Sequence, residues 1–205
     1  MIDIASEIGV IERETGNRPV AGAEGRSVLL RCSYDAPIED VWDAVTDPDR
    51  LKRWFLPVSG ELEVGGAYQL EGNAGGEILA CEPPRLLRVS FGGPESEVEL
   101  RLTPDGDQRT SFELEHAVPA QYFDGSGALA VGPGWDGAVM GLGLFLRGEV
   151  FDDPVAAASS REVQEFSQQS VYAWAAVVES AGIANEAQLA EAIKASVSHF
   201  APDVA

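Results

Sequence analysis

The sequence contains few of the residues from which metal and redox sites are built. Its 205 residues include two cysteines, Cys32 and Cys81, and two histidines, His116 and His199. The cysteines lack metal-binding spacing, and two widely separated histidines cannot by themselves form an ordinary zinc site. Isolated thiols in strand-like segments are typical of buried side chains in a reducing compartment. We therefore expect a cytoplasmic protein that binds no metal.

Basic residues and long apolar runs are also scarce. The chain has 14 Lys and Arg residues against 34 Asp and Glu, which gives a formal net charge of −20. This charge repels phosphate backbones and anionic lipid head groups, so it disfavours nucleic-acid and membrane-surface roles. The longest nearly uncharged apolar run, residues 138–146, is too short to cross a bilayer, and the N-terminus does not resemble a secretory signal. We predict a soluble protein without membrane insertion, whose partner is neutral or apolar.

Motifs of the common cofactor sites are absent from the sequence. No G-x-G-x-x-G segment follows a strand, and neither a P-loop lysine motif nor H-E-x-x-H occurs. The glycine-rich segment GNAGG lies between two predicted strands, where it is interpreted as a turn. We therefore predict no cofactor.

The hydrophobic patterns that are present predict an α+β protein. Residues 27–34 alternate like a half-buried strand, and two short helices follow over residues 35–45 and 46–55. Turn-forming segments then separate six further strands, which suggests an antiparallel meander. Those six strands are expected at residues 60–64, 67–71, 76–82, 85–91, 97–103 and 109–118.

A glycine-rich segment, residues 132–149, nevertheless has the period of a helix. Its apolar residues Trp135, Val139, Leu142 and Leu146 recur every three or four positions. Each internal glycine costs about 0.5 to 1 kcal/mol relative to alanine. We expect a compensating close approach of another backbone, or space for a bound molecule. Two more helices are predicted at residues 161–182 and 185–200.

Together these elements predict a curved seven-strand antiparallel sheet around the long helix of residues 132–149. A sheet that curls around one helix rarely closes on it completely, so a cavity is expected between them. Residues 1–26 are expected to be weakly ordered, residues 27–152 to form the sheet-and-helix domain, and residues 160–200 to form a helical appendage packed on it.

The segment SYDAPIEDVWDAVTDPDRLKRWF resembles the opening of START-like (SRPBCC) helix-grip proteins, in particular the group similar to the C-terminal domain of the Hsp90 ATPase activator. The similarity continues through VGGAYQLEG, CEPPRLLRVSF, ELEH and GPGW, and covers about residues 27 to 150. It implies the helix-grip fold with a deep hydrophobic pocket between sheet and long helix. Members of this superfamily include lipid carriers, polyketide aromatase/cyclases and co-chaperone domains, so fold alone does not decide the activity.

Nine side chains are predicted to line the pocket, two of them with chemical roles. On the strand 109–118, His116 shares its face with Phe112 and Leu114, which directs it toward the helix, while Glu113 and Glu115 take the opposite face. It is the candidate general acid/base, and Tyr68 is its candidate helper. The alternative for both His116 and Tyr68 is that the side chain only donates a hydrogen bond to a backbone carbonyl. The predicted lining residues are Leu30, Trp54, Phe55, Tyr68, Val89, Phe112, His116, Trp135 and Val139.

Three functions follow from these features. The first is a non-catalytic carrier or sensor that binds a small hydrophobic molecule, with Trp54 and Phe55 either gating the pocket or plugging it. The second is an aromatase/cyclase-type enzyme that uses His116. The third is a co-chaperone-like interaction module. The C-terminal helices are expected either to cap the pocket or to form a homodimer contact, and Asp136 is expected to do no more than complement the N-terminus of the long helix.

Overall fold

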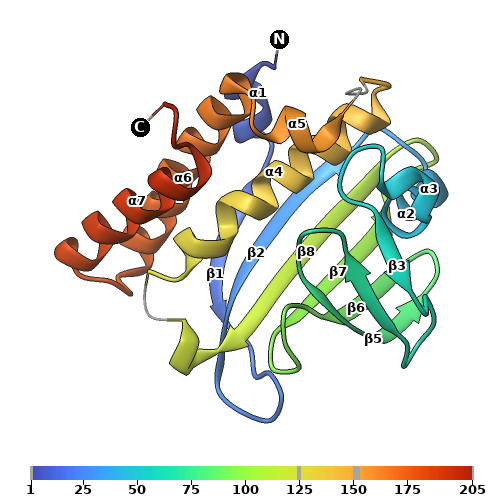
Figure 1. The fold of residues 1–205 in the computed structure, drawn as a ribbon, viewed down its shortest axis with the longest axis horizontal. Helices are drawn as coiled ribbons and strands as arrows, with labels where there is room; N and C mark the ends of the chain where they lie inside the picture. The colour runs from blue at the N-terminus through green and yellow to red at the C-terminus, as the bar shows by residue number, and fades with distance from the viewer. Residues whose placement is uncertain (1, 124–125, 150–152, 205) are drawn as a thin grey trace.

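The structure is a computed structural model that describes residues 2–123, 126–149 and 153–204. Its centre is an open antiparallel sheet of eight strands in the order β1-β2-β8-β7-β6-β5-β4-β3 (Figure 1). The first predicted strand, β2, therefore pairs with the last, β8, as a helix-grip fold requires. The strands are β1 Glu12–Asn17, β2 Gly25–Tyr34, β3 Val58–Gly60, β4 Ala67–Leu70, β5 Gly75–Glu82, β6 Leu86–Ser90, β7 Glu97–Pro104 and β8 Thr110–Pro119.

The eighth strand is the one that the sequence did not predict. It is β1, in the N-terminal segment that we expected to be weakly ordered, and helix α1 (Ile4–Gly9) precedes it. Its sequence, ERETGN, has no apolar alternation. As an edge strand, β1 is held mainly by its backbone pairing with β2, and such pairing leaves no apolar pattern in the sequence. The strand predicted at residues 60–64 is also misplaced. The observed strand, β3, ends at Gly60, and the chain then turns through Gly65, whose φ is 86°.

Two short helices follow β2, as predicted. They are α2 (Ile38–Thr46) and α3 (Pro48–Leu51). The α3 cap is Asp47, whose side chain accepts hydrogen bonds from the backbone N–H groups of Asp49 and Arg50. Thr46 does not cap α3, because its hydroxyl instead donates to the carbonyl of Trp42 at 2.8 Å.

The long helix α4 (Ala128–Leu146) crosses the inner face of the sheet (Figure 1). It starts four residues before the predicted position and continues through Pro133. Proline has no N–H, so the carbonyl of Leu129, four residues back, lacks its helical donor. The hydroxyl of Ser196 donates to this carbonyl at 2.7 Å and satisfies it. A proline inside the helix is thus tolerated because a later helix supplies the missing bond.

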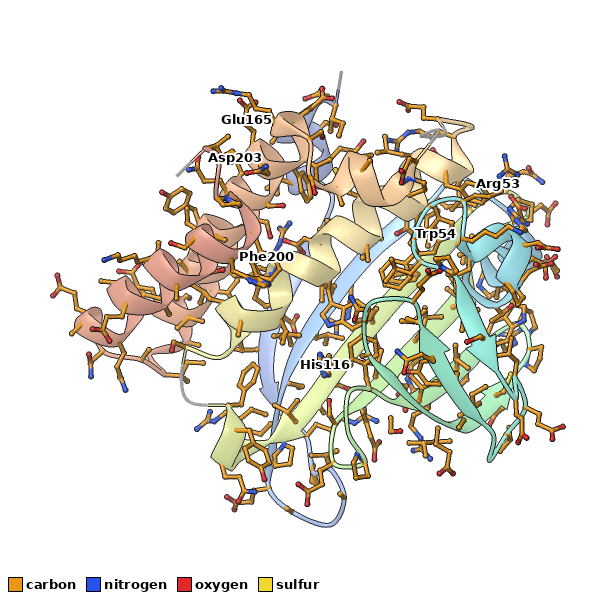
Figure 2. All side chains as sticks on the ribbon, viewed as in Figure 1. Arg53, Trp54, His116, Glu165, Phe200 and Asp203 are labelled. Carbon is orange, nitrogen blue, oxygen red and sulfur yellow. The ribbon has the colours of Figure 1, made fainter. Side chains whose placement is uncertain are left out.

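Two long helices, α6 (Arg161–Ala181) and α7 (Glu186–Phe200), cover the side of α4 that faces away from the sheet. Of the two short ones, η1 (Ala120–Tyr122) contacts β2 and α5 (Pro154–Ala158) contacts α6. Gly182 ends α6 in a left-handed conformation, and an Asn185–Gln188 capping box opens α7. Both α6 and α7 pack on α4, so sheet, α4 and these two helices form three layers (Figures 1 and 2).

This layering explains the apolar character of α4. By length and composition, α4 is the one helix among the described residues that is apolar enough to cross a membrane. However, 56% of its most apolar window is buried inside the protein, between the sheet and α6. Its apolar surface is therefore that of a core helix.

The predicted close approach to α4 occurs at Gly132. A Cβ atom at this position would lie 2.4 Å from the indole of Trp174 on α6, and Trp174 is fully buried. Gly143 meets the ring of Tyr34 more loosely, at 3.4 Å. The neighbour of Gly132 is thus a side chain and not the backbone that we expected. The glycine makes room for the large aromatic residue that joins the two helices.

We predict opposite effects for two alanine substitutions in α4. Gly132→Ala forces the fully buried Trp174 to move and should lower the free energy of unfolding by about 1 to 3 kcal/mol. Gly137→Ala is the matched control, because no atom lies within 4 Å of its Cβ position, and its better helix propensity should raise stability by up to about 1 kcal/mol. Urea unfolding measures both, and equal effects of the two substitutions would contradict the assigned contact.

Candidate functional site

A cavity of about 230 Å³ lies between α4 and the inner face of the sheet and is partly open to solvent. Its walls come from the end of α2, from α3, from strands β3 to β8 and from the middle of α4. Nearly all of the lining side chains are aliphatic or aromatic, and the polar exceptions are Thr46, Glu63, Tyr68 and Cys81. This arrangement favours an apolar occupant.

The structure places most of the predicted lining residues at this cavity. Seven of the nine contribute to its wall: Trp54, Phe55, Tyr68, Val89, Phe112, Trp135 and Val139. Others that the prediction missed share strand faces with these seven, for example Leu87 and Phe91 on either side of Val89. Alternation along β6 and β7 is the sequence signal that identifies them.

Leu30 and His116 do not line the cavity, which corrects the prediction for both. Leu30 is fully buried on β2, and β2 is the strand against which α4 packs most closely. The inner side chains of β2 therefore form solid core, while the cavity opens over the other strands. His116 does point toward α4, as the alternation predicted (Figure 2), but it contacts Trp135, and Trp135 is the residue of this pair that lines the cavity.

Both ring nitrogens of His116 are engaged in hydrogen bonds. The indole Nε1–H of Trp135 donates to Nδ1 at 3.0 Å, and Nε2 lies 2.9 Å from Oγ of Ser96. An indole can only donate, so Nδ1 must be unprotonated and the proton of the neutral ring must sit on Nε2, where it is donated to Ser96. The ring is 5% exposed, and burial lowers its pKa to about 4. Neither nitrogen is free to exchange a proton with a bound molecule.

His116 therefore acts on the cavity through Trp135. The hydrogen bond ties α4 to β8, and Phe91 and Trp135 pack against the imidazole with ring centroids 5.6 and 5.8 Å away. Of the two interpretations that the sequence left open, the structure favours a histidine with satisfied partners. Those partners are side chains and not the backbone carbonyl that we had expected.

Tyr68 also has an internal partner. Its hydroxyl donates to the backbone carbonyl of Ser90 at 2.8 Å, and burial raises its pKa to about 12. A phenol with this pKa and a fixed donor is a poor proton relay at neutral pH. Its oxygen keeps lone pairs, however, and the residue stays on the cavity wall.

Trp54 and Phe55 stand at the wall nearest α3, stacked with ring centroids 5.4 Å apart. The indole Nε1–H of Trp54 donates to the carbonyl of Ala44 at 2.9 Å, and the backbone carbonyl of Trp54 approaches α4 at Gly141. These contacts fix Trp54 between the segment after α3 and α4, where Figure 2 shows it.

The glycines of α4 do not create the hollow, contrary to our hypothesis. The α4 side chains at the cavity are Trp135, Ala138, Val139 and Leu142, and no α4 glycine belongs to the described lining. Likewise, no described residue of α5, α6 or α7 lines the cavity, so the C-terminal helices do not cap it. Space remains over the strands from β8 to β3 because α4 packs closely on β2 and less closely on the rest of the sheet.

Asp136 has a larger role than the sequence suggested. It is fully buried within α4, where Oδ2 accepts from Nε of Arg13 at 2.8 Å and from the hydroxyl of Ser170. Arg13 lies on β1 and Ser170 on α6, so the carboxylate joins three elements. Burial raises the pKa of Asp136 to about 6, against the opposing influence of Arg13. Sequence reasoning missed this cluster because its members are far apart in the chain.

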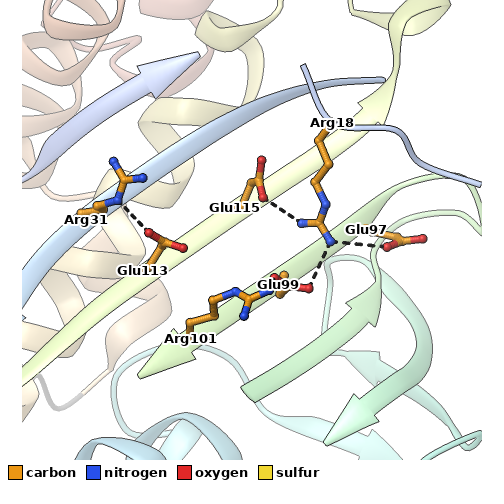
Figure 3. Close-up of polar contacts among 7 residues, drawn as sticks. All are labelled: Arg18, Arg31, Glu97, Glu99, Arg101, Glu113 and Glu115. Atoms are coloured by element: carbon orange, nitrogen blue, oxygen red, sulfur yellow. Dashed lines mark hydrogen bonds and ion pairs between the residues drawn. The ribbon is translucent and has the colours of Figure 1, made fainter. Parts of the chain in front are cut away.

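Charged side chains gather on the outer face of the sheet, opposite the cavity. Alternation along β8 places Glu113 and Glu115 there, as predicted, and arginines from neighbouring segments neutralise part of the charge (Figure 3). The sheet thus separates a charged outer surface from an apolar inner one. The ion pairs join Arg18 to Glu97, Glu99 and Glu115, Arg31 to Glu113, and Arg101 to Glu99.

Comparison with known proteins adds three findings. A family model described as "Activator of Hsp90 ATPase homolog 1-like protein" matches residues 35–144. A crystal structure of CalU16 from Micromonospora echinospora is 44% identical, with a TM-score of 0.70 over 82% of this chain and 98% of CalU16. A comparison with curated proteins finds no match.

Two further solved structures share the fold less closely. DynU16, a protein in the dynemicin biosynthetic locus, is 28% identical, with a TM-score of 0.54 over 62% of this chain and 50% of DynU16. The Aha1 dimer from Colwellia psychrerythraea is 17% identical, with a TM-score of 0.52 over 60% of this chain and 97% of Aha1. At that identity, the Aha1 comparison supports the fold alone.

We predict that His116 keeps its neutral Nε2–H tautomer between about pH 8 and pH 5. NMR of labelled imidazole nitrogens measures this directly, and titration near 6.5 would contradict the assigned hydrogen bonds. The folded pKa of about 4 lies below the ordinary 6.5, so the unfolded chain takes up the proton first as pH falls. The contribution of His116 to stability should therefore be lost between about pH 6.5 and pH 4, and His116→Gln should abolish that part of the pH dependence.

Proposed function

Because the chain belongs to the family of Activator of Hsp90 ATPase homolog 1-like proteins, whose fold it has, we propose that it binds a small hydrophobic molecule without transforming it. The observation that carries this proposal is the apolar cavity between α4 and the sheet. Burial of apolar surface contributes about 25 cal/mol per Å², so such a wall by itself provides affinity.

The size of the cavity indicates the size of the guest. Engineered cavities of about 150 Å³ in another protein bind benzene. At about 230 Å³, and with one side open to solvent, this cavity suits a molecule or moiety of about two fused rings. The location of DynU16 in a biosynthetic locus supports a guest of the specialised-metabolite kind as part of the proposal.

The alternative enzymatic function receives little support from the site. A cyclase-type mechanism needs groups that exchange protons with the bound molecule. His116 has both nitrogens engaged and lies behind Trp135, while the proton of Tyr68 is donated to Ser90. We therefore place the carrier or sensor role first.

Chaperone binding and a homodimer through α6 and α7 stay predictions. The family name favours the first, and the Aha1 dimer belongs to a chain too distant to transfer an assembly. Neither function requires a cavity, so a test of ligand binding separates them from the proposed one.

We predict that the neutral fluorophore prodan binds to the purified protein with an increase and blue shift of its emission. Ala138→Phe should weaken this binding at least about tenfold, because the added ring would project from α4 into the cavity. Gly137→Ala changes the adjacent position, which does not line the cavity, and should leave binding unchanged.

Native mass spectrometry of protein taken directly from cells provides an independent check. A bound apolar molecule that is lost in Ala138→Phe would support the proposal. Prodan binding of equal strength in wild type and Ala138→Phe, with both proteins folded, would place the probe elsewhere and contradict it.

A further inference from the structure

The hydrogen-bond donors on the cavity wall are already used inside the protein. Five lining side chains carry a proton on nitrogen, oxygen or sulfur: Thr46, Trp54, Tyr68, Cys81 and Trp135. Thr46, Trp54 and Tyr68 donate to the backbone carbonyls of Trp42, Ala44 and Ser90, at 2.8, 2.9 and 2.8 Å. Trp135 donates to Nδ1 of His116 at 3.0 Å. The fifth, Cys81, carries a thiol, which is a weak donor.

The direction of these bonds follows from chemistry and not from hydrogen placement. A backbone carbonyl can only accept, so the hydroxyl protons of Thr46 and Tyr68 must point at their carbonyls. What each hydroxyl offers to the cavity is its oxygen lone pairs. The wall therefore presents acceptors, and it lacks strong side-chain donors.

The charged residues of the wall also disfavour a guest that carries an acidic group. The described lining contains no Lys, Arg or His, and its charged residue is the acidic Glu63, at the exposed rim. A carboxylate or phosphate of a guest would find no cation and would face the charge of Glu63. An acidic group buried without a partner is strongly disfavoured.

We infer that the guest is an aromatic or polycyclic molecule that carries hydroxyl donors and no acidic group, and that it donates a hydrogen bond to Oη of Tyr68. The inference rests on the proposed function and narrows it. It excludes fatty acids and other anionic amphiphiles, which an apolar cavity alone would admit. Two half-buried hydroxyls lie on this wall, those of Thr46 and Tyr68, and we assign this specificity to the phenol of Tyr68.

Three probes of one shape test the inference by displacement of prodan. They are 2-naphthol, which donates, 2-methoxynaphthalene, which only accepts, and 2-naphthoate, which is anionic. We expect 2-naphthol to bind about five-fold more tightly than 2-methoxynaphthalene, because only the former gains a hydrogen bond. We expect 2-naphthoate to bind at least about tenfold more weakly than 2-naphthol.

Tyr68→Phe removes the acceptor and should bring 2-naphthol down to the affinity of 2-methoxynaphthalene, whose own binding should not change. Tyr172→Phe makes the same substitution at an exposed tyrosine of α6 and should leave all affinities as they are. Thermal unfolding establishes that both variants are folded. The comparison of probes on the wild-type protein needs no variant, so it decides the inference even if Tyr68→Phe is unstable.

The outcomes separate this inference from the proposed function. If prodan binds at the cavity but 2-methoxynaphthalene or 2-naphthoate equals 2-naphthol, the donor preference is wrong and the carrier function stands. A Tyr68→Phe variant that weakens 2-naphthol and 2-methoxynaphthalene equally would show a structural role for Tyr68 and overturn its assignment. If prodan and all three naphthalenes fail to bind the folded protein, the proposed function falls, and the inference falls with it.

Discussion

The position of α4 between two layers is the constraint on which the rest of the structure depends. Toward the sheet, the hydrogen bond from Trp135 to His116 fixes the distance between the helix and β8. On the other side, the next residue, Asp136, joins α4 to Arg13 of β1 and to Ser170 of α6. The two consecutive residues point about 100° apart around the helix axis and hold α4 on two sides, so the helix cannot move into the hollow without breaking buried polar contacts, which is costly.

The same contacts account for the chemistry of the cavity. Each polar side chain that reinforces the wall uses its proton to do so: Trp54 joins the segment after α3 to α2, Tyr68 joins β4 to β6, and Trp135 joins α4 to β8. A wall stiffened in this way is depleted of donors while its acceptors stay available. The rigidity of the wall and the ligand preference that we propose are therefore two consequences of one set of hydrogen bonds.

The sequence predicted those features that depend on local periodicity. Alternation along residues 109–118 placed Phe112 and His116 on the inner face and Glu115 on the outer one, and both placements are correct. It did not predict β1, whose pairing with β2 is a long-range backbone interaction without an apolar pattern. Nor did it predict Asp136 as a buried junction, or Ser196 as the donor that completes α4 at Pro133, since both depend on the docking of the C-terminal helices. Leu30 was assigned to the cavity for a related reason: strand alternation gives the face but not how closely the helix packs on each strand.

The two buried titratable groups beside α4 respond to acid in opposite directions. Between about pH 6.5 and pH 4, His116 stays neutral in the fold while the unfolded chain becomes protonated, so acid weakens its contribution to stability. Asp136 has a folded pKa of about 6, above the ordinary 3.8, so over much of the same range the folded protein takes up a proton more readily and acid favours folding. The two effects on stability oppose one another at adjacent residues of α4. His116 acts on the helix through its hydrogen bond with Trp135, and Asp136 belongs to the helix itself. Mild acid therefore changes the stability of the fold less than either group alone would, which is consistent with the proposed role of the cavity as a site for an uncharged guest.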